Sequence, residues 1–177
     1  MASPAARARP KLYVEIGGVK AAAKCGLRKK ALETLTKEFS ASNKVTLDIG
    51  KPAPKGKALA KVLKKRRLKG YRVQLRITKC GTEVHPPPKG KVYRVLMASV
   101  SVAVDAEKLP SDQMALAGQG SASVGTEIST VKEKEKRQLL GEAMVAATKQ
   151  AVGKSIATLL GGKTKKRRRR RRKRRRK

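Results

Sequence analysis

The side chains with the most evident chemistry are basic, and they are concentrated in residues 163–177. Of these 15 residues 14 are Lys or Arg, and nine of the 14 are Arg. So dense a block repels itself and is predicted to be disordered, while its guanidinium groups suit forked contacts with phosphate oxygens. The polyanion-binding residues predicted here are Lys163, Lys165, Lys166, Arg167, Arg168, Arg169, Arg170, Arg171, Arg172, Lys173, Arg174, Arg175, Arg176 and Lys177.

Basic residues also dominate the rest of the chain. The whole sequence has 46 basic and 12 acidic residues and a net charge of +34, so residues 1–162 keep 46 − 14 = 32 basic residues and a charge of +20. Arg72 and Arg76, on a predicted strand, are among these basic residues. Because acidic residues are so few, we expect these arginines to lack acidic partners. Binding to a nucleic acid would then follow backbone charge and not base sequence. The binding residues predicted within a helix are Lys64, Lys65, Arg66 and Arg67.

Residue types that support catalysis or metal binding are scarce. The only histidine, His85, precedes three prolines and is predicted to be a solvated loop residue. One His and two distant Cys do not make a zinc ligand set. The stretch 50–58 resembles a phosphate-binding loop but has five residues between its glycines and Ala58 in place of the hydroxyl residue. We therefore expect no catalytic residue, metal, cofactor or small-molecule substrate, and the protein is predicted not to be an enzyme.

The two cysteines, Cys25 and Cys80, are 55 positions apart. In an exported protein they could form one disulfide bond, whereas in the cytosol they would be two free thiols. The sequence leaves both alternatives open.

Hydrophobic periodicity predicts the elements that hold these residues. Alternating apolar residues indicate strands at 11–23, 44–49, 71–78, 91–106 and 113–128. Helical spacing indicates helices at 27–39, 58–69 and 132–160, the second of them ended by Gly70. This β-α-β-α-β-β-β-α order predicts an α/β (α+β) fold, a two-layer sandwich of three helices on a mixed sheet of about five strands. The strands linked by helices should be parallel, and residues 71–128 should form an antiparallel meander.

Composition divides the chain into a flexible lead at 1–10, a single α/β domain at 11–160 and a disordered tail at 161–177. The lead has no apolar core of a secretory signal, although a mature chain that has lost its signal would look the same. Aromatic residues make up only 2% of the sequence, too few for a platform that stacks bases. The helix at 132–160 carries two apolar stripes, which predicts burial on more than one side or a homo-oligomer.

Three stretches carry a resemblance to a bacterial envelope domain: residues 70–79, residues 92–106 and the small-residue strand at 118–125. Over residues 11–160 the chain resembles the α/β domain of the curli-secretion lipoprotein and the penicillin-binding-protein activator lipoprotein. The resemblance implies a β-α-β-α order followed by a meander and a closing helix, in an assembly or regulatory module without catalytic residues. The polybasic tail and the +20 body depart from that pattern.

Two functions follow from these observations. The first is a non-catalytic, sequence-independent nucleic-acid-binding protein, most naturally of DNA but also of RNA, that uses the tail and the basic domain surface and is associated with the nucleoid. The alternative is an exported accessory or assembly protein, periplasmic or extracellular, whose tail binds anionic membrane lipid or polysaccharide. A disulfide between Cys25 and Cys80 would favour the alternative.

Overall fold

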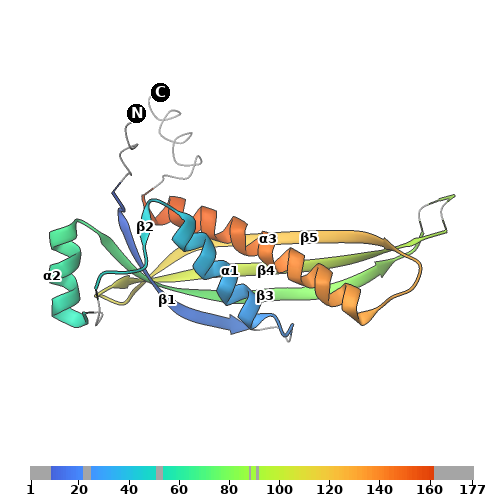
Figure 1. Ribbon diagram of the computed structural model, residues 1–177, viewed down its shortest axis with the longest axis horizontal. Coiled ribbons are helices and arrows are strands. Elements are labelled where there is room, and N and C mark those ends of the chain that lie inside the picture. Colours follow the sequence, from blue (N-terminus) through green and yellow to red (C-terminus); the bar gives the residue numbers. More distant parts are fainter. Residues whose placement is uncertain (1–8, 22–24, 51–53, 88, 91, 162–177) are drawn as a thin grey trace, which may run out of the picture.

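The computed structural model describes residues 9–21, 25–50, 54–87, 89–90 and 92–161, and Figure 1 shows the arrangement of its elements. These are β1 (Leu12–Ala21), α1 (Arg28–Ala41), β2 (Val45–Thr46), α2 (Gly56–Arg66), β3 (Lys69–His85), β4 (Arg94–Leu109), β5 (Gln113–Ile128) and α3 (Glu133–Leu159). The order of elements along the chain is the predicted one.

The strands form one mixed sheet in the order β2-β1-β3-β4-β5. Strand β1 runs parallel to both β2 and β3, since α1 connects β1 to β2 and α2 connects β2 to β3, and β3, β4 and β5 form an antiparallel meander. Helices α1 and α3 pack on each other and cover one face of the sheet, whereas α2 stands apart from them at one end (Figure 1). The predicted α/β sandwich of three helices on a five-stranded sheet is confirmed.

The main core lies between the sheet and helices α1 and α3. Leu12, Leu75 and Val102 extend from the sheet into this layer, where they are buried with Phe39 of α1 and Met144 of α3. Since side chains alternate along a strand, Tyr13 points to the opposite face. There it joins the second, smaller apolar cluster, which attaches α2 to the sheet. The buried members of that cluster are Tyr13, Ile49, Leu59, Leu63 and Leu109.

Helix α3 lies very close to β5 because two positions of β5 that face the helix are glycines, Gly118 and Gly120. A Cβ atom at Gly120 would collide with the carbonyl oxygen of Ala147 and would lie 2.8 Å from the nitrogen of Ala151. Gly118 meets Ala151 in the same way. Glycine in a strand commonly marks the close approach of another backbone, and here it allows the backbone of α3 to pack closely against β5.

The two apolar stripes of α3 are both used within the chain. One packs on β4 and β5, and the other side of the helix meets α1, where Lys149 lies 3.8 Å from Glu38. The stripes therefore require no second copy of the chain, and self-association through this helix stays a prediction. None of the helices in the described part of the chain is long and apolar enough to cross a membrane.

Three predicted boundaries were wrong. The strand predicted at 71–78 runs from Lys69 to His85, so His85, which was expected in a loop, ends the strand. The strand predicted at 44–49 is only Val45–Thr46, because Thr46 Oγ1 bonds the backbone of Asp48 and turns the chain out of the sheet. Helix α2 ends at Arg66, and Gly70 lies inside β3. At Gly70 a Cβ atom would press on Leu63 of α2, so this glycine allows the helix to pack on the strand.

Candidate polyanion-binding surface

The predicted basic cluster at 64–67 forms the exposed end of α2. Leu59 and Leu63 bury the apolar side of the helix, so Lys64, Lys65 and Arg66 in its last turn face solvent. Cations at this end also interact favourably with the helix dipole, which is a structural reason for their presence.

The residue that ends α2 has an unusual backbone. Arg67 has φ 55° and ψ 40°, the left-handed conformation that glycine usually supplies at this position. Its N–H donates to the Lys64 carbonyl at 3.1 Å, and the N–H of Leu68 donates to the Leu63 carbonyl at 2.9 Å. This pair of bonds is a Schellman motif. A non-glycine residue in it costs on the order of 1 kcal/mol, so the structure holds the Arg67 backbone in a fixed, strained position.

A shallow hollow of about 560 Å³ opens beside this helix end. Four cationic residues from separate parts of the chain line it, together with Pro10, Thr46 and Leu68. None of the ion pairs found among the described residues involves any of these four. The acidic residue Asp48 follows Thr46 by two positions, and its Oδ1 accepts a hydrogen bond from the Gly50 N–H at 2.8 Å. The cationic lining residues are Arg9, Lys65, Arg66 and Arg67.

The end of α3 reaches the same end of the molecule. A Cβ atom at Gly161 would lie 4.0 Å from Nζ of Lys69, the first residue of β3. The predicted binding residues of the tail begin at Lys163, two positions further along the chain, and lie outside the described residues. The last described residue of the chain therefore lies next to the side chain of Lys69, three positions after the end of α2. We call the cations gathered here the basic pole: Arg9, Lys64, Lys65, Arg66, Arg67 and Lys69.

The expectation that the strand arginines lack acidic partners was wrong. Nε of Arg72 lies 3.0 Å from Oε1 of Glu15, and Arg76 makes a forked contact with Asp105 at 3.1 and 3.2 Å. The pKa of each arginine is raised, mainly by its hydrogen bond to the neighbouring carboxylate. The acidic residues come from β1 and β4, which neighbour β3 in the sheet, so these two arginines are neutralised by their neighbours.

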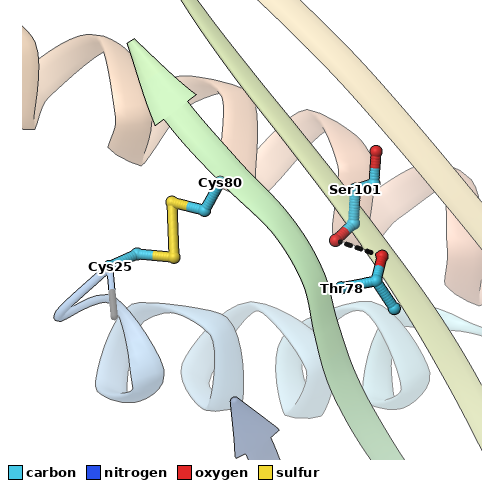
Figure 2. The surroundings of a disulfide bond; sticks show 4 residues. All are labelled: Cys25, Thr78, Cys80 and Ser101. Carbon is cyan, nitrogen blue, oxygen red and sulfur yellow. Dashed lines mark hydrogen bonds between the residues drawn. A yellow bond between two sulfur atoms is a disulfide. The ribbon is translucent and has the colours of Figure 1, made fainter. Parts of the chain in front are cut away.

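The two cysteines form a disulfide bond, shown in Figure 2. Cys25 comes from the segment before α1 and Cys80 from the middle of β3, and their Cα atoms are 6.2 Å apart. Both side chains are partly buried against the main core. Two positions before Cys80 on the same strand, Thr78 Oγ1 donates to the carbonyl of Ser101 on β4 at 3.0 Å, beside a shift in the β3–β4 register (Figure 2). The bond anchors the start of α1 to the sheet.

The remaining predictions concern catalysis and metals. His85 is exposed at the end of β3, and its Nε2 lies 3.9 Å from Oε2 of Glu83. Within the described ranges no group of three His, Cys, Asp or Glu side chains could hold a metal ion.

The arrangement of the basic pole suits electrostatic binding of an anion.

Sequence reasoning missed two features of this surface. Arg9 was assigned to the flexible lead, and nothing in the sequence indicated that it would line a hollow with residues of α2. The left-handed conformation of Arg67 was also missed, because Gly70 offered a more conventional end for the helix. A Leu63–Leu68 spacing typical of a Schellman motif was the available signal.

No family model and no curated protein matches the sequence. Several solved structures have a similar fold. A hypothetical protein of Chlamydia trachomatis is 11% identical with a TM-score of 0.48, and the match covers 84% of this chain and 98% of the other. A DUF330 protein of Xanthomonas campestris is also 11% identical, with a TM-score of 0.48 and coverages of 88% and 89%. A minor lipoprotein of Acinetobacter baumannii is 10% identical, with a TM-score of 0.43 and coverages of 81% and 94%. Likeness at this distance says nothing of function.

Proposed function

We propose that the protein is an exported, non-catalytic accessory protein that attaches to an anionic lipid or polysaccharide surface through its basic pole and tail. The disulfide between Cys25 and Cys80 is the observation that carries this proposal. Disulfide bonds persist in oxidising compartments outside the cytosol and are rare within it. The bond therefore favours export over a role inside the cytosol.

The distribution of charge supports attachment by one end. The basic pole has no ion pair among the described residues, and the tail with its 14 cations begins beside it. Each cation near an anionic membrane contributes about 1 kcal/mol, and the contributions of the pole and the tail would add on the same side. Arg72 and Arg76 of the sheet, which are already paired with acidic residues, would add little to the attachment. The folded body would then stand on the surface with α2 toward it.

Export can be tested by the state of the thiols in cells. The protein is treated with an alkylating agent at lysis, and the mass of the intact chain is measured without reductant. We expect no labelled thiol before reduction and two after it, because an exported protein keeps its disulfide. Two labelled thiols in the unreduced sample would contradict export.

Nucleic-acid binding is the second candidate, favoured by the 14 basic residues in 163–177. Full engagement of these charges with duplex DNA would give a limiting slope of log K against log salt near −13. Deleting residues 163–177 is therefore predicted to lower the affinity for a DNA duplex at least about tenfold near physiological salt. A fluorescence-anisotropy salt titration measures this, and an unchanged affinity would contradict the role of the tail.

The same titration distinguishes the two candidates if it includes anionic vesicles and heparin. A preference of residues 1–162 for DNA over both other ligands would favour the nucleic-acid function. Binding of vesicles or heparin at least as tightly as DNA, together with a disulfide formed in cells, would favour the surface-attached accessory protein.

A further inference from the structure

Arg67 combines three properties that a purely structural residue at a helix end does not need. Its backbone is in the left-handed conformation that favours glycine, the residue is one of those that line the hollow, and none of the ion pairs among the described residues includes it. Non-glycine residues held in such conformations cluster at binding sites, where the strained backbone fixes the position of a side chain. The Schellman bonds to Leu63 and Lys64 supply that fixation.

We propose that the hollow at the end of α2 is a binding site for a phosphate monoester group. This inference rests on the proposed attachment to an anionic surface and specifies the chemical group that the folded body recognises. Arg9 comes from the segment before β1, whereas Lys65, Arg66 and Arg67 come from the end of α2, so the four cations approach the hollow from two parts of the chain.

The composition of the hollow favours phosphate over a carboxylate. Three of its four cations are guanidinium groups, which form paired hydrogen bonds with phosphate and carboxylate oxygens alike, and the fourth is an ammonium group. The preference therefore comes from the charge of the anion, because four cations line the hollow. A phosphate monoester near neutral pH carries close to two negative charges and presents three acceptor oxygens, against one charge and two oxygens for a carboxylate.

Phosphate binding can be measured on the full chain by following the backbone amide signals of Arg66 and Leu68. Inorganic phosphate is added at about pH 8, where it carries close to two charges, and sodium acetate at equal ionic strength is the comparison. We expect a saturable shift with phosphate and a much weaker response to acetate. Equal responses to the two anions would overturn the site.

Three variants separate the site from general charge. Arg67→Gly removes the guanidinium group and suits the left-handed backbone, so the helix end should remain folded. It should weaken phosphate binding roughly tenfold, and Arg67→Lys, which keeps the charge, should retain only part of the affinity. Arg137→Ala removes one exposed cation from α3 and should change the affinity less than about twofold. If Arg67→Gly and Arg137→Ala behave alike, the site is overturned, while tail-dependent attachment to vesicles would be unaffected.

Vesicles identify the source of the phosphate. Phosphatidic acid presents a phosphate monoester, and phosphatidylserine at equal surface charge presents a phosphodiester and a carboxylate. A loss of Arg67→Gly binding that is larger for phosphatidic acid vesicles supports the site with a lipid headgroup as its ligand. A loss for inorganic phosphate alone supports the site with a soluble phosphate as its ligand.

Discussion

At the level of single residues, Gly120 determines how closely the helical layer approaches the sheet. Any side chain there would meet the backbone of α3 at Ala147 and Ala151. Gly153, on the exposed side of the same helix, has no atom within 4 Å of an added Cβ. The two glycines therefore make a matched pair in which the same substitution has opposite consequences.

Gly120→Ala is predicted to lower the free energy of unfolding by about 3 kcal/mol, because backbone atoms cannot move aside as a flexible side chain would. Gly153→Ala should raise it by about 1 kcal/mol, since alanine is the better helix former. Urea denaturation measures both. A Gly120→Ala variant as stable as the wild type would contradict the close packing of α3 on β5.

Thr148 carries a hydroxyl group that the fold does not use. The residue is fully buried in α3, and its Oγ1 has no hydrogen-bond partner in the part of the chain that the structure describes. Thr148→Val removes the unpaired polar atom and keeps the shape, so it should raise the free energy of unfolding by about 1 kcal/mol. Thr158→Val, where an exposed hydroxyl donates to the Lys154 carbonyl, is the control and should change stability by less than about 0.5 kcal/mol. Thermal and urea denaturation report both, and destabilisation by Thr148→Val would show that its hydroxyl is satisfied.

At the level of elements, the disulfide joins the segment before α1 to the centre of β3 across 55 positions of sequence. Its two ends belong to parts of the fold that otherwise meet through apolar contacts in the main core. A covalent link over so long a loop restricts the unfolded chain far more than it restricts the folded one.

Replacing both Cys25 and Cys80 with Ser is predicted to lower the free energy of unfolding by up to about 4 kcal/mol, as the loop-entropy relation gives for a loop of this length. Urea denaturation with and without reductant measures the loss. Reductant should bring the wild type to the midpoint of the double variant and leave the variant unchanged. A wild-type midpoint insensitive to reductant would contradict the stabilising role of the bond.

The elements themselves could be predicted because local pattern determines them. Alternation of apolar residues in β3, β4 and β5 and helical spacing in α3 indicated both the type and the order of elements. Contacts between distant residues could not be predicted in this way. The partners of Arg72 and Arg76 come from β1 and β4, and only the pairing of strands brings these charges together.

The candidate site was predicted only in part, for the same reason. The exposed cations at 64–67 follow from the amphipathic pattern of α2, in which Leu59 and Leu63 must face the sheet. The hollow depends on Arg9, which a different segment supplies, and on the left-handed backbone at Arg67. The position of Arg9 is not encoded in the local pattern around the cluster, and the only local signal for the left-handed backbone was the spacing of Leu63 and Leu68.

At the level of the whole molecule, some cations are paired with acidic residues and others are not. Acidic residues neutralise the arginines of the open sheet face, whereas the basic pole at the end of α2 is left without ion pairs among the described residues. The tail begins beside this pole. A protein of this charge would bind many polyanions weakly through any surface, so the central claim is that binding is directed by one end.

The most direct test compares two variants that each lose four exposed cations, in binding to vesicles of phosphatidic acid and phosphatidylcholine at physiological salt. The pole variant combines Lys64→Gln, Lys65→Gln, Arg66→Gln and Arg67→Gly. The control combines Arg28→Gln, Lys29→Gln, Lys134→Gln and Lys154→Gln, on α1 and α3. We predict that the pole variant binds at least about tenfold more weakly than the control, since each cation held near the surface contributes about 1 kcal/mol. Equal losses in the two variants would contradict the account, because binding would then follow total charge and not the basic pole.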